Sequence, residues 1–305
     1  MGTERNLLDA GGPTRPQSGF SPEWLALREP LDAQARAPAL ARLLRQRLSS
    51  DTPLRVVDLA TGTGANLRWL APHLGGAQEW LMVDHDRELL RVLPAALGAW
   101  AGEAGYEAEV RDNRVCIAAP SFHARVGVEH LDLVRQLGDL PLGNCRLVTA
   151  SALLDLVSAT WLASLAGRAR AAGCDLLFAL SYDGRMALAP REPDDERLRA
   201  LVNRHQRSDK GFGPALGPSA GAGAADVLRD LGYAVWTRPS DWHIEPRQRA
   251  VQDALITAWA SAARELEPFA GREIDAWLSR RRGHLNAGRS RITVGHQDLL
   301  ALLPR

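Results

Sequence analysis

The sequence has few cysteines, almost no net charge and no long apolar run, and each shortage excludes a class of protein. The three cysteines lie far apart without the spacing of metal ligands, so we expect no metal site and buried free thiols in a cytoplasmic protein. A net charge of +1 offers no basic face for nucleic acid or an anionic membrane. Apolar runs fall short of the roughly 20 residues that span a bilayer. Residues 1–19 contain acids and no apolar core, so we expect no signal peptide.

What the chain does have is an alternation of strand and helix patterns along 305 residues, enough for one large α/β domain with additions or for two small domains. Residues 1–20 are typical of a flexible N-terminal arm, residues 21–52 predict a helical cap, and residues 53–305 predict one domain. The apolar patterns predict strands at 56–59, 79–84, 123–133, 145–151, 174–184, 233–244 and 290–303, with an inserted hairpin at 107–118. Helices are expected at 87–105 (broken near Pro94), 153–173, 191–207, 225–232, 247–267 and 272–281, and a Gly/Pro-rich loop at 208–225.

The most informative stretch is VVDLATGTGANLRWL, residues 56–70. A β-branched run leads to Asp58, and Gly62 and Gly64 then allow a positive φ and a close approach of the backbone. Asn66 can cap the helix that follows. A strand, a glycine turn and a helix in this order begin a nucleotide-binding α/β unit.

Two kinds of nucleotide site use such a turn. The dinucleotide fingerprint G-x-G-x-x-G fits poorly, because Leu67 stands where the third glycine belongs. The order of hydrophobic run, acid and glycine turn resembles the first motif of the class I S-adenosylmethionine (SAM)-dependent methyltransferases, with Ala60 in place of its first glycine. The resemblance implies a Rossmann-like fold, namely a seven-stranded, mostly parallel sheet with helices on both faces. Here it would carry an N-terminal helical extension and inserted helices at about 246–284. The implied cofactor is SAM and the product S-adenosylhomocysteine (SAH).

Two carboxylates follow successive strands of this unit. Asp58 is placed near the ammonium group of SAM, and Asp84 can accept hydrogen bonds from both ribose hydroxyls. The alternative is that Asp58 caps the turn and Asp84 caps the next helix. The resemblance further places Asp132 near the adenine amino group, with Leu133 beside the ring, and lets Ser151 and Ala152 close the site. The predicted cofactor-binding residues are Asp58, Ala60, Thr61, Gly62, Thr63, Gly64, Asn66, Asp84, His85, Asp132, Leu133, Ser151 and Ala152.

The N-terminal helix is one candidate cover for the methyl acceptor. Trp24, Arg28 and Asp32 recur at helical spacing, with Arg36 one step further along the same face. Trp24 is a candidate to reach the cleft, and the two arginines could bind an acceptor carboxylate or phosphate. The alternative is a surface stripe of salt bridges.

A second candidate cover is a lid at about 191–224, which is polar and then rich in glycine. His205 is the candidate general base, with Asp209 and Lys210 beside it, Phe212 as a substrate contact and His243 as a second candidate base. The alternative is a solvated helix end followed by a flexible loop. The SRRRGH stretch at 279–284 is interpreted as a solvated helix end, and His284 and His296 as structural or exposed.

The sequence therefore predicts SAM-dependent methyl transfer to a small-molecule acceptor, with O- or N-methylation favoured. A methyltransferase acting on protein or RNA, a SAM-binding protein with altered activity and a nicotinamide oxidoreductase remain the alternatives. The expected partner is the small-molecule methyl acceptor, with no nucleic acid and no membrane, and the sequence leaves the oligomeric state open.

Overall fold

The computed structural model describes residues 20–48 and 52–304. The predicted arm, residues 1–20, lies outside these residues except for its last position. Within the described ranges, the helices are all too short or too polar to cross a membrane. Cys145 and Cys174 are buried as expected, whereas Cys116 is exposed, and all three are free thiols.

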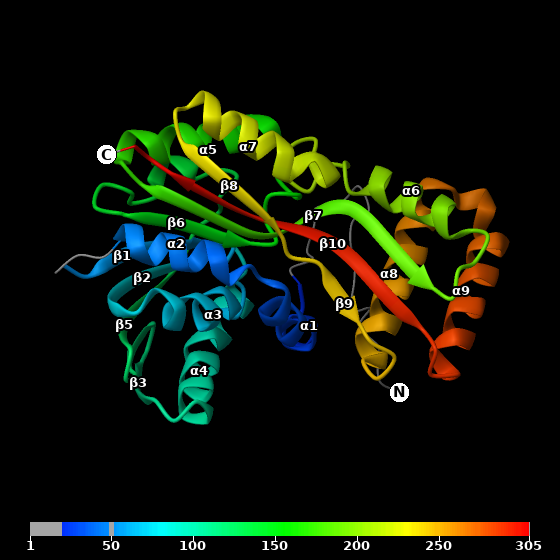
Figure 1. Ribbon diagram of the computed structural model, residues 1–305, viewed down its shortest axis with the longest axis horizontal. Helices are drawn as coiled ribbons and strands as arrows, with labels where there is room; N and C mark the ends of the chain where they lie inside the picture. The colour runs from blue at the N-terminus through cyan, green and yellow to red at the C-terminus, as the bar shows by residue number, and fades with distance from the viewer. Residues whose placement is uncertain (1–19, 49–51, 305) are drawn as a thin grey trace.

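A single mixed sheet forms the centre of the molecule (Figure 1). Its seven core strands lie in the order β5-β2-β1-β6-β7-β10-β8, and only β10 runs against the others. The predicted hairpin, β3 and β4, extends the sheet beyond β5, and β9 pairs with β10. The bounds are β1 Leu54–Leu59, β2 Gly76–Asp84, β3 Glu107–Arg111, β4 Arg114–Ala118, β5 Phe122–His130, β6 Leu147–Ser151, β7 Asp175–Ala189, β8 Ala234–Pro239, β9 Trp242–Ile244 and β10 Arg291–Leu302. The predicted Rossmann-like class is confirmed, with ten strands in place of seven.

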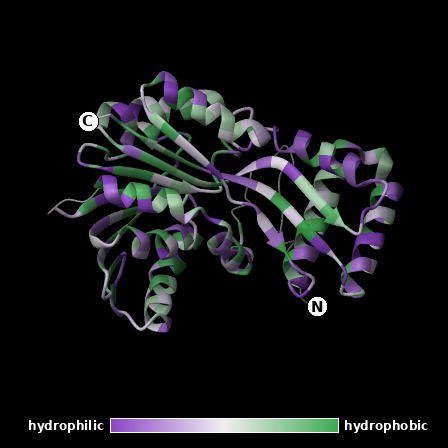
Figure 2. Cartoon of the chain, in the orientation of Figure 1, coloured by the Kyte–Doolittle hydropathy of each residue, from purple (hydrophilic) through white to green (hydrophobic). Residues whose placement is uncertain are grey.

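Helices cover both faces of the core sheet (Figure 1). One face packs against α2 (Pro38–Leu48), α3 (Ala65–Leu74) and α4 (Arg87–Glu103), and the other against α5 (Ala159–Ala172) and α7 (Ala220–Asp230). Figure 2 shows the apolar colouring of the strands between these layers. Burial on both faces explains why the parallel strands read as nearly continuous apolar runs in the sequence.

A third apolar core forms away from these layers. The strands β7 and β10 continue past the others as a long pair, on which α6 (Asp195–His205), α8 (Arg249–Leu266) and α9 (Gly271–Asn286) pack (Figure 1). The N-terminal helix α1 (Pro22–Ala35) contributes Trp24 and Leu31 to the same core and contacts β9. Helix α1 therefore lies between the half that carries the glycine turn and this added lobe.

Three local expectations are wrong in instructive ways, and a fourth is refined. The predicted N-terminal cap is helical but forms two helices, because the residue before Pro38 disfavours helical geometry and Arg36 is extended at ψ 150. Helix α4 continues through Pro94, a buried residue of the core, without a break. The predicted strand at 233–244 is split into β8 and β9. The expected loop at 220–225 is the first part of α7, whose Gly221 lets the helix pack closely on Gln297 of β10.

Candidate functional site

The glycine turn joins β1 to α3 in left-handed backbone geometry. Ala60 has φ 50, Gly62 φ 57 and Gly64 φ 88, and Gly64 is the N-cap of α3. Ala60 occupies a conformation that normally favours glycine. The backbone N–H of Thr61 donates to the carbonyl of Val83, which ties the turn to the end of β2. The turn thus opens at the carboxyl ends of the parallel strands, where doubly wound sheets bind ligands.

Asp58 lies fully buried beneath this turn. Its carboxylate accepts hydrogen bonds from Thr61 Oγ1 at 2.6 Å and from Asn66 Nδ2 at 2.5 Å. The amide of Asn66 also donates to Thr149 Oγ1 on β6 at 3.1 Å. Burial raises the pKa of Asp58 to about 6, although the hydrogen bonds from Thr61 and Asn66 oppose the rise. Asp58 therefore fixes the turn, as the capping alternative predicted, while keeping its charge close to the site.

Asp84 at the end of β2 faces the same turn. One oxygen accepts from the backbone N–H of Gly62 at 2.9 Å and the other from that of Asp86 at 3.0 Å, and His85 Nδ1 lies 3.2 Å away. Burial raises the pKa of Asp84, but the bonds from His85, Asp86 and Gly62 outweigh it and hold the pKa below its usual value. Asp86, not Asp84, caps α4. Each carboxylate oxygen has two lone pairs, so Asp84 can still accept from a ligand.

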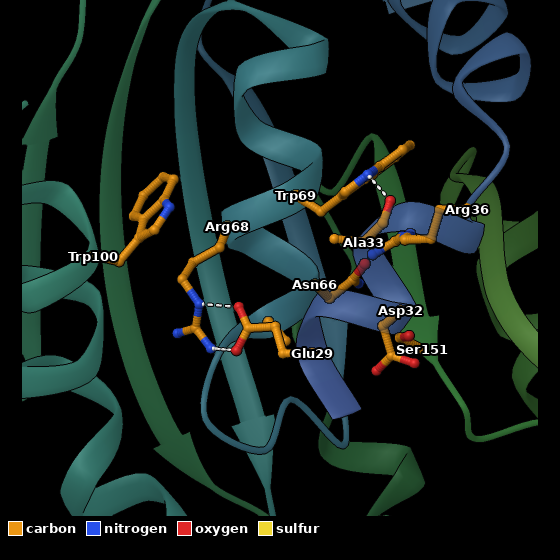
Figure 3. A pocket seen from close by; sticks show the side chains of 10 residues that line it. Glu29, Asp32, Ala33, Arg36, Asn66, Arg68, Trp69, Trp100 and Ser151 are labelled. Atoms are coloured by element: carbon orange, nitrogen blue, oxygen red, sulfur yellow. Dashed lines mark hydrogen bonds and ion pairs between the residues drawn. The ribbon is translucent and has the colours of Figure 1, made fainter. Parts of the chain in front are cut away.

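A cavity of about 160 Å³ lies between α1 and α3 (Figure 3). Its walls come from α1, α3, Trp100 of α4 and Ser151 at the end of β6; the lining residues are Glu29, Asp32, Ala33, Arg36, Ala65, Asn66, Arg68, Trp69, Trp100 and Ser151. Small-molecule pockets usually measure about 300–1,000 Å³. The cavity in this arrangement of α1 therefore has room for only part of a nucleotide.

Arg36 is the most unusual residue of the cavity. Its side chain is only 5% exposed, and its Nε and Nη2 have no hydrogen-bond partner among the described residues. The guanidinium lies 4.3 Å from the ring centroid of Trp69. Burial lowers the pKa of Arg36, opposed by the charges of Asp298, Asp32 and Asp58. In the same cavity, Oδ1 of Asn66 is also buried without a partner in the described chain.

Helix α1 covers both the turn and the cavity. The methyl group Cδ1 of Leu25 lies 3.1 Å from where a Cβ on Gly62 would stand, so the glycine is required for this contact. Glu29 pairs with Arg68, and Trp69 Nε1 donates to the carbonyl of Ala33 at 3.1 Å (Figure 3). A ligand that extends from the cavity across the glycine turn would therefore meet the Leu25 side chain of α1.

The other predicted cofactor residues surround the strand ends. Ser151 lines the cavity, and Ala152 follows it at φ 54. Thr63 accepts from Arg68 Nη1 through its carbonyl at 2.6 Å. Asp132 lies beyond β5, where its carboxylate accepts from the N–H of Val134 at 2.9 Å, and Leu133 is buried beside it. The structure thus brings Asp58, Asp84, the turn, Asn66 and Ser151 together, with Asp132 at the neighbouring strand exit.

Three of the predicted substrate contacts are engaged with other residues of the protein. Arg28 forms an ion pair with Asp32 at 2.9 Å, as the surface-stripe alternative predicted, but both side chains are only 12% exposed. Trp24 is buried in the third core, and Phe212 packs edge-on against Trp161 of α5 at 5.2 Å.

The predicted catalytic residues do not line the cavity. His205 Nε2 lies 2.8 Å from Glu265 Oε2 of α8, so it sits at the contact between α6 and α8. Asp209 closes a turn by accepting from the N–H groups of Gly211 and Gly213, Lys210 Nζ donates to Ser208 Oγ, and His243 is exposed on β9. Their roles remain predictions.

Three buried polar residues near the cavity were not among the predicted site residues. Asp155 and His296 are each 7% exposed, and Asp298 is 3% exposed. Asp298 accepts from the backbone N–H of Ala37 at 2.8 Å, which fixes the chain next to Arg36. The sequence offered one local signal, the acid Asp155 at the start of the predicted helix that follows the fourth strand.

The strand order and the glycine turn are those of a Rossmann-like, doubly wound α/β fold. No family model and no curated protein matches the chain. It resembles the solved cyclopropane-fatty-acyl-phospholipid synthase-like protein from Lactobacillus casei, at 13% identity over 90% of this chain and 99% of that one, with a TM-score of 0.47. A SAM-dependent methyltransferase from Thiobacillus denitrificans in complex with SAH is 16% identical over 93% and 100% of the two chains, with a TM-score of 0.41.

A third solved structure is the phosphoethanolamine N-methyltransferase 2 of Haemonchus contortus in complex with SAM. It is 11% identical over 95% of this chain and 59% of that one, with a TM-score of 0.43. Identities and TM-scores this low leave the fold assignment to rest on the strand order and the turn.

Proposed function

We propose that the chain is a class I SAM-dependent methyltransferase acting on a small molecule. The observation that carries the proposal is the pair of unpartnered polar groups in the cavity, the guanidinium of Arg36 and the carbonyl oxygen of Asn66. A guanidinium binds a carboxylate through two parallel hydrogen bonds, and an amide oxygen next to the Asp58 carboxylate suits an ammonium group. The two groups together match an α-amino acid, which SAM has at one end and nicotinamide dinucleotides lack.

The remaining residues fit the rest of the same molecule. The glycine turn offers a flat backbone surface for the ribose, and Asp84 can accept from its two hydroxyls. A dinucleotide would instead place its pyrophosphate against the N-terminus of α3. Leu67 is fully buried where the third glycine of that fingerprint allows close packing.

SAM supplies a methyl group that its sulfonium has already activated. The chain would hold the amino-acid end with Arg36 and Asn66, hold the ribose with Asp84, and close α1 over the turn to exclude water. Alignment of the acceptor atom is the main contribution left to the protein, and in favourable systems it supplies about 7–11 kcal/mol. An O- or N-acceptor is favoured. A macromolecular acceptor and a SAM-binding protein with altered activity remain the rival functions.

Cofactor identity is tested by titrating the protein with SAH, NAD and NADP in a calorimeter. We expect SAH to bind with a dissociation constant in the micromolar range or below, because a charged pair and the ribose bonds add to apolar burial of the adenine. NAD and NADP should not bind in the same range. If NAD binds and SAH does not, the proposal is wrong.

Replacing Asp84 by alanine should weaken SAH binding by about 1–3 kcal/mol, the usual effect of losing hydrogen bonds to a charged group. The matched control is Asp86→Ala, which removes the N-cap of α4 two residues away. That change should lower stability by about 1 kcal/mol but leave the affinity for SAH unchanged. Equal SAH affinity in wild type and Asp84→Ala would show that Asp84 only secures the turn.

A further inference from the structure

A second group of buried polar and aromatic side chains adjoins the cavity. We call it the acceptor cluster; it consists of Arg28, Asp155, Tyr182, Trp242 and His296. It lies where α1 meets β9 and the long pair of β7 and β10 (Figure 1). Asp32 connects it to the cavity, because Asp32 lines the cavity and also accepts from Trp242 Nε1 at 3.0 Å.

The rings and charges of the acceptor cluster are close to one another. Cζ of Arg28 lies 5.3 Å from the ring centroid of Trp242. The ring centroids of His296 and Trp242 lie 4.9 Å apart. The ring centroids of Tyr182 and His296 lie 6.2 Å apart. Asp155, four residues beyond Ser151, is within electrostatic reach of both Arg28 and Tyr182.

Two buried polar atoms of the cluster are left without a partner in the described chain, Oδ1 of Asp155 and Nδ1 of His296. The other charges are matched: Arg28 is paired with Asp32, and Asp241, next to β9, accepts from the backbone N–H of His296 and pairs with Arg185. A buried polar atom without a hydrogen-bond partner lowers the stability of the fold. Such atoms therefore indicate that a bound ligand supplies the missing hydrogen bonds. Here the missing group is a donor for Asp155.

The pKa values of Asp155 and His296 agree with a missing hydrogen-bond donor. Burial raises the pKa of Asp155 to about 6. Backbone hydrogen bonds at Asp155 and Tyr182, and the charges of Arg28 on α1 and Lys210 after α6, oppose this rise. Burial, together with the charge of Arg28, lowers the pKa of His296 to about 3, so this imidazole is neutral at pH 7. At neutral pH the cluster therefore offers one carboxylate and one neutral ring nitrogen.

We propose that the acceptor cluster binds an amine as the methyl acceptor and that Asp155 takes the proton its nitrogen must lose. The proposal rests on the proposed function. Aromatic rings and a carboxylate with one unpartnered oxygen are complementary to an alkylammonium group, whereas an acidic acceptor would meet that carboxylate as a like charge. The N–H bond breaks, its electron pair stays on nitrogen as the lone pair, and the proton forms an O–H bond with Oδ1 of Asp155. His205, bonded to Glu265 of α8, is the rival base.

The experiment measures ligand binding to protein saturated with SAH. The probes are a set of primary and secondary amines, each with the alcohol and the carboxylic acid of the same carbon skeleton. Amines should bind, and binding should strengthen as the pH rises through about 6, because Asp155 loses its proton there. Asp155→Asn should weaken amine binding at least tenfold and remove this pH dependence. Asp253→Asn, an exposed change of the same kind on α8, should do neither.

Three results would overturn the inference. They are failure of all amines to bind at millimolar concentration, tighter binding of the carboxylic acids, and unchanged amine binding by Asp155→Asn. Loss of the pH dependence in His205→Ala, but not in Asp155→Asn, would assign the base to His205. SAH affinity, measured first for every variant, reports correct folding. If SAH itself does not bind, the proposed function fails; if SAH binds and amines do not, only this inference fails.

Discussion

Replacing Arg36 by glutamine is expected to weaken SAH binding by at least about 100-fold while leaving the binding of adenosine unchanged. Arg36 is buried beside the cavity with Nε and Nη2 unpartnered in the described chain, so a bound carboxylate would take both hydrogen bonds. Hydrogen bonds to charged groups are worth about 1.5–3 kcal/mol each, and about 1.4 kcal/mol is a factor of ten in affinity. Adenosine lacks the carboxylate and therefore does not need Arg36.

The adenosine measurement also guards against a folding defect. Arg36 lies among the charges of Asp32, Asp58 and Asp298, and Arg28 pairs only with the first of these, so removal of Arg36 takes a nearby cation from the buried Asp58 and Asp298. If the variant still binds adenosine like wild type, the turn and Asp84 are intact. Arg42→Gln on α2, an exposed change of the same kind, should affect neither ligand. Equal loss of SAH and adenosine affinity in Arg36→Gln would contradict the assignment of Arg36 to the carboxylate.

Replacing Arg281 by methionine is expected to destabilise the protein by about 3–5 kcal/mol, the usual loss when one partner of a buried ion pair is removed. The sequence suggested a solvated helix end here, but the Arg281 side chain is only 1% exposed. It pairs with Asp195, and its Nη1 donates to the carbonyl of Pro190 at 2.6 Å. Trp277 Nε1 donates to the same carboxylate at 2.9 Å. The pair thus joins α9 to the start of α6 in the added lobe.

The neighbouring arginine supplies the control for this measurement. Arg282 pairs with Asp253 at 2.8 Å with both side chains 45% exposed, so Arg282→Met should cost less than about 1 kcal/mol in urea unfolding. The double change Arg281→Met with Asp195→Asn should recover part of the loss, because no unpaired buried charge remains. Equal stability of Arg281→Met and Arg282→Met would show that the buried pair contributes little.

The sequence by itself determined the features that depend on neighbours along the chain. A β-branched run followed by glycines at 62 and 64 forms a strand and a left-handed turn, and the acid inside that run necessarily lies under the turn. The alternation of strands and helices likewise determined a parallel sheet covered on both faces. These inferences needed only local φ preferences, hydrogen bonding within a few residues and the period of the apolar pattern.

Tertiary structure alone decided what meets at the site. Arg36 reaches the cavity because the backbone of Ala37 is bonded to Asp298, 261 residues away. Asp155 and His296 approach the same α1 helix only because β7 and β10 extend past the core and carry β9 with them. No local propensity encodes the length of that overhang or the place where α1 packs. They follow from burying the apolar side chains of α1, α6, α8 and α9 together, and that packing is a property of the whole chain.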